Sequence, residues 1–198
     1  MGQCWQIVNI DRHETLGNWG ELDSFFCIPN CFADLISLLA DPSPWAGCRI
    51  MCIGGQMKDC PPGILTSEEL AEIKKLPTTR YGKTLYTLAA GYYEEASPWQ
   101  YRSLRGMVLR NLAKRVYVRR DVVEEELRLN IGDLCNVLLT NICWSAGSCE
   151  MEVDITRGAW AGDRLDVVPF SVVENNEERE DVTEDQVKLT RFALDRSM

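Results

Sequence analysis

Several features that the sequence lacks exclude whole classes of protein. The 198 residues contain no long uninterrupted apolar run, because even the apolar stretch 138–144 is broken by polar residues. A helix that crosses a bilayer needs about 20 consecutive apolar residues. No basic segment followed by an apolar core opens the chain, so we expect no secretory signal. These absences predict a cytoplasmic protein that does not insert into a membrane.

Positive charge is also scarce. The chain has 30 acidic and 21 basic residues, a net charge of −9 and a pI near 4.7. A nucleic-acid phosphate backbone is bound by a basic surface, which this composition does not provide. The dense basic stretch 110–120 is followed by acidic residues, which is typical of a solvated face. We therefore expect no nucleic-acid partner.

Catalytic and cofactor motifs are missing as well. The sequence has no Gly-x-Ser-x-Gly nucleophile elbow, no phosphate-binding glycine loop and no dinucleotide fingerprint. We accordingly predict no cofactor. His13 is the single histidine, and it is the only side chain whose ordinary pKa suits proton transfer near neutral pH.

Nine cysteines are present, and their odd number in a chain of this length favours reduced thiols over a disulfide scaffold. Cys27 and Cys31, followed by Cys48 and Cys52, have spacing that also suits a tetrahedral zinc ion. Against zinc, positions four apart on a strand lie too far apart to chelate one ion readily. Buried free thiols are favoured, and a zinc site stays as the alternative.

Periodicity predicts a mixture of strands and helices. Apolar spacing indicates helices over 31–40 and 131–144, and alternation or β-rich composition indicates strands over 5–10, 48–53 and 163–170. Thr66 and Glu69 form a capping-box pattern that predicts a helix starting at residue 67. The segment 101–118 is compatible with a helix or with a strand-turn-strand. The expected fold class is α+β.

Two sequence segments recur in the same order. Residues 9–16 resemble 111–118, and Trp-Ala-Gly-Cys-Arg-Ile at 45–50 resembles Trp-Ala-Gly-Asp-Arg-Leu at 160–165. We interpret them as two diverged strand-helix-strand repeats packed as one pseudo-symmetric globular unit. The expected organisation is a first repeat over 1–57, a helical insert over 58–103, a second repeat over 104–172 and an acidic tail over 173–198.

The same elements resemble a group of proteins from mushroom-forming fungi. The resemblance rests on Asn-x-x-Arg-x-Glu at 9–14, Ile-Cys-Trp-Ser at 142–145 and Trp-Ala-Gly-Asp-Arg at 160–164, and single-copy bacterial relatives share the first and last elements. It implies no particular activity. This chain departs from the pattern at Cys48, where the group has Asp, and at Ala113 and Val116, which replace polar residues.

These departures predict a composite site, since each half retains polar residues that the other lacks. The candidate catalytic residues are Asp11, His13, Glu14, Asp163 and Arg164. The alternative interpretation of the segment 11–14 is a hydrogen-bonded turn.

Two functions remain open. The first is a binding or interaction module that recognises a protein or a small ligand through aromatic anchors. The second is a small acid–base enzyme that uses the composite site between the repeats. The candidate ligand-binding aromatic residues are Trp5, Trp19, Trp45, Trp144 and Trp160.

Overall fold

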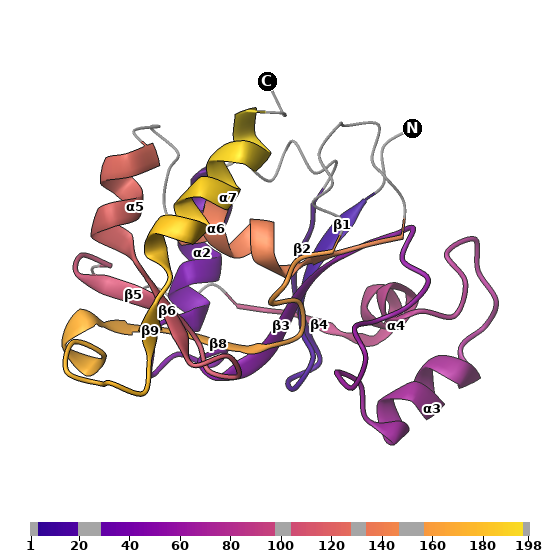
Figure 1. Ribbon diagram of the computed structural model, residues 1–198. Coiled ribbons are helices and arrows are strands. Elements are labelled where there is room, and N and C mark those ends of the chain that lie inside the picture. The colour runs from indigo at the N-terminus through magenta and orange to yellow at the C-terminus, as the bar shows by residue number, and fades with distance from the viewer. Residues whose placement is uncertain (1–3, 20–28, 98–103, 128–133, 147–156, 196–198) are drawn as a thin grey trace.

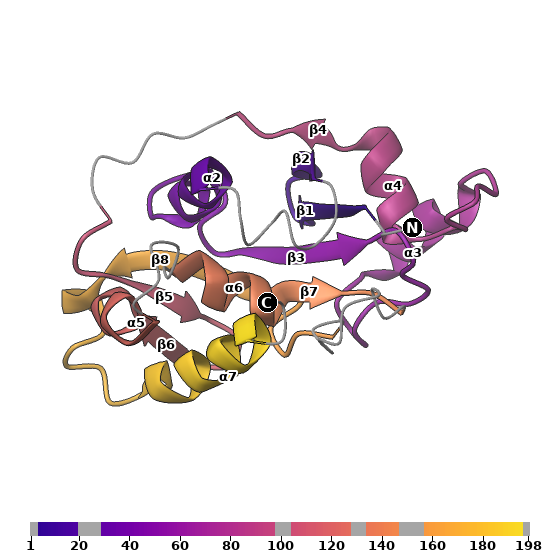
Figure 2. The ribbon, with the colours of Figure 1, turned by 90° about the horizontal axis from the view of Figure 1, so that it is seen from above.

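The computed structural model describes residues 4–19, 29–97, 104–127, 134–146 and 157–195. A nine-stranded mixed sheet runs through the molecule, and helices pack on both of its faces (Figures 1 and 2). The strands are β1 (Trp5–Asn9), β2 (Glu14–Trp19), β3 (Cys48–Gly54), β4 (Glu94–Glu95), β5 (Met107–Asn111), β6 (Val116–Arg119), β7 (Cys143–Trp144), β8 (Arg164–Pro169) and β9 (Glu180–Asp181). The predicted α+β class is confirmed.

Six α-helices and one short 3-10 helix occur in the described ranges. They are α2 (Pro29–Leu39), α3 (Ser67–Lys75), α4 (Leu85–Tyr92), α5 (Arg120–Leu127), α6 (Leu134–Ile142), α7 (Thr183–Asp195) and η1 (Phe170–Val172). None of the helices in these ranges has the length and hydrophobicity that a membrane crossing requires.

Two antiparallel hairpins flank the centre of the sheet. β1 pairs with β2, and β5 pairs with β6. β3 and β8 lie between the hairpins and run antiparallel to each other, which gives the order β4-β2-β1-β3-β8-β5-β6-β9, with β7 beside β3. The segment 101–118 therefore forms strand-turn-strand rather than helix over its described part. Asn111 stabilises that turn by accepting the Lys114 amide proton at 2.9 Å.

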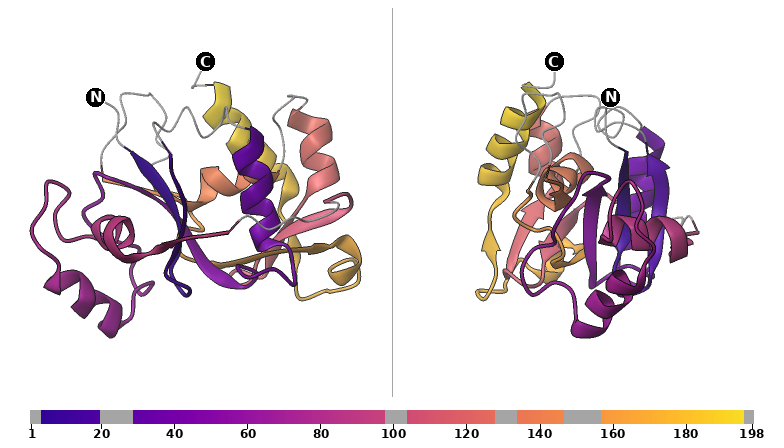
Figure 3. Two further views of the ribbon diagram at one scale, coloured as in Figure 1. Left: turned by 180° about the vertical axis from the view of Figure 1, so that it is seen from behind. Right: turned by 90° about the vertical axis from the view of Figure 1, so that its right-hand side faces the viewer.

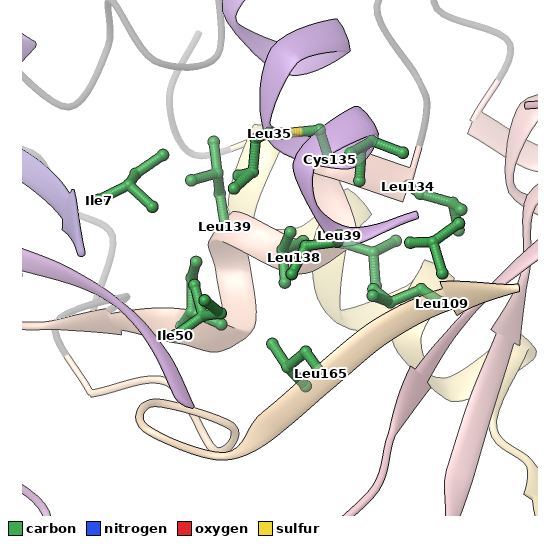
Figure 4. Close-up of a cluster of buried hydrophobic side chains, with 14 of the residues drawn as sticks. Ile7, Leu35, Leu39, Ile50, Leu109, Leu134, Cys135, Leu138, Leu139 and Leu165 are labelled. Carbon is green, nitrogen blue, oxygen red and sulfur yellow. The ribbon is translucent and has the colours of Figure 1, made fainter. Parts of the chain in front are cut away.

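The larger core lies on the sheet face covered by α2, α5, α6 and α7. Figure 4 shows aliphatic side chains of α2 and α6 converging on residues that point up from β1, β3, β5 and β8. Every residue of α6 is buried, and the helix predicted over 131–144 is confirmed over Leu134–Ile142. The core residues labelled in Figure 4 are Ile7, Leu35, Leu39, Ile50, Leu109, Leu134, Cys135, Leu138, Leu139 and Leu165.

A second core forms on the opposite face, under α3 and α4. Alternate residues of β3 supply the two cores: Ile50 and Cys52 face the first, and Met51 and Ile53 face the second. The helices α3 and α4 gather at one end of the sheet, away from the other helices (Figures 1 and 3). They belong to the predicted insert 58–103.

The start of α3 has the predicted capping box. Thr66 Oγ1 accepts the Glu69 amide proton at 3.2 Å, and a Glu69 carboxylate oxygen accepts the Thr66 amide proton at 2.7 Å. Two of the amide groups that a helix start leaves without intrahelical partners are thereby satisfied.

The described part of the C-terminal segment, residues 173–195, contains a strand and a helix, which differs from the expected acidic tail over 173–198. β9 extends the sheet beside β6, and α7 packs against the larger core through Val187 and Ala193. The acidic residues Glu184 and Asp185 occupy the first turn of α7, where negative charge interacts favourably with the helix dipole and stabilises the helix. Composition alone suggested a solvated segment, but apolar residues at helical spacing dock it.

The six described cysteines form no disulfide bonds. Cys52, Cys135 and Cys143 are buried. Cys52 and Cys143 are Cα partners where β3 pairs with β7. The side chains of Cys27 and Cys31 lie outside the described residues. Within those residues, no three His, Cys, Asp or Glu side chains are grouped to hold a metal ion.

Candidate functional site

A network of charged side chains joins the turn after β1 to β3 and α3. Arg49 donates to Asp11 twice, from its backbone amide at 2.9 Å and from Nε at 2.6 Å. The far end of the same guanidinium donates to Glu69 at 2.7 and 3.2 Å and to the Ile64 carbonyl oxygen. The three charged side chains are only 12 to 21% exposed. The network therefore connects three segments that are distant from one another in the sequence.

Arg164 adds a second cation to Asp11. It is the Cα partner of Arg49 across β3 and β8, and its Nη1 donates to Asp11 at 2.8 Å and to the Gly47 carbonyl oxygen at 2.9 Å. Its side chain is 53% exposed, in contrast to 15% for Arg49. Asp11 and Arg164, two of the predicted catalytic residues, thus lie in contact.

The electrostatics of this network keep its carboxylates charged. Burial alone raises the pKa of Asp11, but hydrogen bonds and the charges of Arg49 and Arg164 outweigh it, so the pKa lies below its ordinary value. The pKa of Glu69 is lowered in the same way, because the bonds from Arg49 and from the Thr66 amide oppose the effect of burial. Both groups are therefore poor proton acceptors at neutral pH.

We expect these lowered pKa values to make the fold acid-sensitive. A carboxyl whose folded-state pKa is depressed stabilises the protein above its unfolded pKa, and this stabilisation is lost as the pH falls through the folded value. The free energy of unfolding, measured with urea, should therefore drop on acidification below about pH 4.5. Glu69→Gln should reduce the slope of that drop.

Glu68→Gln is the matched control for this pH dependence. Glu68 lies in the same first turn of α3 but is exposed and forms no ion pair among the described residues. The free energy of unfolding of the Glu68→Gln variant should fall with pH as steeply as that of the wild type. Identical pH slopes for wild type and Glu69→Gln would contradict the stabilising role of the network.

The other predicted acidic residues lie in separate arrangements. Asp163 accepts from Asn111 Nδ2 at 2.7 Å and lies 3.5 Å from the Lys114 ammonium. Glu14 accepts from the Trp45 indole nitrogen at 2.6 Å and from Arg12 Nε at 3.1 Å. Each of these carboxylates is thus hydrogen-bonded to its own neighbours.

His13 lies on the hairpin turn, with a backbone φ of 55°. Its carbonyl oxygen accepts the Glu94 amide proton at 3.0 Å, which attaches the turn to β4. Its ring stacks on Tyr93, with centroids 5.0 Å apart and planes 20° from parallel. Within the described ranges, no carboxylate is hydrogen-bonded to the ring. The His13 side chain is thus positioned by an aromatic partner.

This stacked pair forms one wall of a cleft between the hairpin turn and the insert. The cleft has a volume of about 360 Å³. Leu76 and Leu88 supply apolar lining, Glu72 and Lys75 supply charge, and Tyr92 stands at the cleft with 66% of its surface exposed. The cleft is thus amphipathic and rich in aromatic surface.

The charged network acts on the Tyr93 hydroxyl electrostatically. Burial, and then the negative charges of Glu69 and Glu72, raise the pKa of this hydroxyl, while Arg49 acts in the opposite direction. The hydroxyl is buried and has no hydrogen-bond partner among the described residues. At physiological pH it is consequently a neutral group with an unused hydrogen-bonding capacity.

The tryptophans predicted as ligand anchors are mostly structural. Trp5, Trp45 and Trp160 are 0 to 2% exposed and belong to the larger core. Trp144 donates to the Asp59 carbonyl oxygen at 3.0 Å and lies under the Arg157 guanidinium. The Trp19 side chain lies outside the described residues. Large rings bury large apolar areas, which explains their place in the core rather than in a binding surface.

His13 of the cleft and Asp11 and Arg164 of the network were predicted as site residues, but the other residues of the cleft and the network were not. Arg49 was visible in the recurring Trp-Ala-Gly-x-Arg segment, and Glu69 in the capping box. No local signal connected either residue to Asp11. Tyr92 and Tyr93 had no signal beyond their place in a helical segment.

Comparisons with known proteins give no further identification. No family model matches the chain, and neither the curated proteins nor the solved structures contain a match.

Proposed function

We propose that the protein is a binding module for a small, largely planar organic ligand, held in the cleft beside His13. The observation that carries this proposal is the aromatic wall made by the stacked His13 and Tyr93 rings, with the exposed Tyr92 ring at the same cleft. Aromatic rings stack favourably on planar groups and provide rigid contact area. A volume of about 360 Å³ accommodates a ligand of a few rings at most.

The polar residues of the cleft define which ligands fit. Glu72 and Lys75 lie on α3, one turn apart, and offer opposite charges to polar substituents. Leu76 and Leu88 contact the apolar body of the ligand. The Asp11–Arg49–Glu69 network stiffens the cleft, because it ties α3 to the turn that carries His13. A preformed cleft reduces the entropy lost on binding.

A titration with small aromatic compounds tests this proposal. The full chain is labelled with nitrogen-15, and indole, p-cresol and nicotinamide are added to it separately. Amide proton–nitrogen correlation spectra are recorded by NMR at each step. We expect at least one compound to shift amide signals of the segments 72–76 and 88–93. Tyr92→Ala should weaken that binding by about threefold to tenfold, the range that one aromatic contact provides.

Phe192→Ala is the matched control for the aromatic titration. Phe192 is 55% exposed on α7, so this variant removes a comparably exposed aromatic ring from another part of the molecule. It should bind the compounds as the wild type does. If all three compounds leave the cleft signals unchanged, or if Tyr92→Ala binds them equally well, the proposed site is wrong.

We also propose that the two halves of the sheet are diverged copies of one unit. Backbone contacts at matched sequence positions support this proposal. Gly47 donates to Leu165 at 2.8 Å as Gly162 donates to Ile50 at 2.9 Å. The corresponding turns have corresponding backbone geometry, with φ of 55° at His13 and 59° at Arg115. Under this proposal, the insert with α3 and α4 supplies most of the lining of the cleft beside His13.

A further inference from the structure

A second cavity has an electrostatic character opposite to that of the whole chain. It has a volume of about 650 Å³ and lies between the segment after β3 and the segment before α4. Three cationic side chains line it, from Lys58, Arg80 and Lys83, and none of the described lining residues is a carboxylate. The chain carries nine more acidic than basic residues, so a lining with only positive charge is a reversal of the overall composition.

The neighbouring acidic group is engaged elsewhere. Asp59, next to Lys58 in the chain, accepts from Arg157 Nη2 at 3.2 Å with both carboxylate oxygens. Within the described parts of the chain, Lys58, Arg80 and Lys83 form no ion pair with a carboxylate. Three positive charges that line one concave surface repel one another, and an anion bound among them relieves this repulsion. The cluster therefore attracts an anion to the cavity.

Two of the cations are held in place by their surroundings. The Arg80 guanidinium lies 4.6 Å from the centroid of the Tyr81 ring. A Cβ atom at Gly55 would lie 3.1 Å from that ring, so glycine there allows the close approach of the ring. Lys83 Nζ donates to the Lys74 carbonyl oxygen at 2.9 Å, which restricts its side chain and leaves the other ammonium protons for an anion. Partial preorganisation favours binding, because less side-chain freedom is lost.

The N-terminal end of α4 adds to the positive potential. Thr84, its N-cap residue, lines the cavity. The first turn of α4 contains no acidic residue, whereas the first turns of α3 and α7 each contain two. Its partial positive charge is therefore not offset by a neighbouring carboxylate.

We propose that this cavity binds a small polyvalent anion that carries phosphate groups. Lysine, arginine and a helix N-terminus are the groups that proteins combine to hold phosphate oxygens. The volume fits a small molecule, and the three cations line the same cavity. The site is separate from the cleft beside His13, so it stands or falls independently of the ligand proposed there.

Calorimetric titration of the full chain with pyrophosphate tests the site. We expect saturable binding of one pyrophosphate that weakens as the sodium chloride concentration is raised. The double variant Lys58→Gln/Arg80→Gln should lose about tenfold or more in affinity, since two charge-assisted contacts are removed. The double variant Lys188→Gln/Arg191→Gln makes the same change in net charge on α7 and should retain the wild-type affinity within about twofold.

Each alternative outcome of this titration has a definite meaning. Absence of pyrophosphate binding at millimolar concentration, or an equal loss in both double variants, would overturn the site. Citrate binding as tightly as pyrophosphate would overturn the preference for phosphate groups. A single-stranded oligonucleotide that binds far more tightly than pyrophosphate would replace the small anion with a nucleic acid as the ligand. Retained pyrophosphate selectivity in the Lys188→Gln/Arg191→Gln variant would support the proposal.

Discussion

Replacing Arg49 with methionine is expected to lower the free energy of unfolding by about 3 kcal/mol. The substitution removes the shared partner of Asp11 and Glu69 and leaves two carboxylates, each 21% exposed or less, without that cation. Removing one member of a buried charged group is far more destabilising than removing the whole group, because desolvated charge remains behind. Urea unfolding followed by tryptophan fluorescence measures the loss, and the buried Trp45 ring reports on the neighbouring structure.

Arg164→Met is the matched control, since the two arginines are Cα partners across β3 and β8. Its side chain is 53% exposed, so we expect a loss of about 0 to 1 kcal/mol. Adding Glu69→Gln to Arg49→Met should recover part of the stability by removing one stranded charge. Equal losses for the two arginine variants, or no recovery in the double variant, would show that burial of the network does not govern its contribution.

Gly158→Ala is expected to destabilise the fold by about 3 kcal/mol, at the upper end of overpacking effects. A Cβ atom at this position would overlap the backbone carbonyl of Asn141 and approach its Cα to 2.9 Å. The obstacle is backbone, not the end of a flexible side chain. Two hydrogen bonds hold these segments together, from the Gly158 amide to the Cys143 carbonyl oxygen at 2.7 Å and from the Trp160 amide to the Asn141 carbonyl oxygen at 2.9 Å. The same urea unfolding experiment measures the effect.

Gly91→Ala provides a control with the opposite sign. Gly91 lies inside α4, and a Cβ atom there would have no neighbour within 4 Å. Alanine favours the helix over glycine, so we expect stabilisation by about 0.5 to 1 kcal/mol. A Gly158→Ala variant as stable as the wild type would contradict the close backbone packing at the end of α6.

The sequence predicted those helices and strands whose formation depends on residues close together in the chain. Thr66 and Glu69 are three residues apart, and the capping box that they form needs no other part of the chain. The apolar spacing over 131–144 predicted α6, because a buried helix requires apolar residues at that period. Composition was misleading at the C-terminus, where acidic residues suggested a solvated tail over 173–198. The segment instead adds a strand, and α7 follows it and docks through apolar residues spaced along the helix.

The candidate site was predicted only in part. Asp11 and Arg164 are in contact, although they are 153 positions apart in the sequence. Glu14 and Asp163 instead hydrogen-bond to Trp45 and Asn111, which nothing in the sequence pattern indicated. The choice of tryptophan as the ligand-contacting residue conflicts with the tendency of large rings to fill a core.

The sequence by itself determined the secondary structure of most segments, the acidic character of the chain and the polar turn that carries Asp11 and His13. These properties follow from residue types and short spacings. Only the tertiary structure decided that Arg49 lies between Asp11 and Glu69, and that the His13 ring stacks on Tyr93. Such contacts join residues 20 to 80 positions apart. They depend on the order of strands in the sheet and on where the α3–α4 insert packs, and no local pattern encodes either.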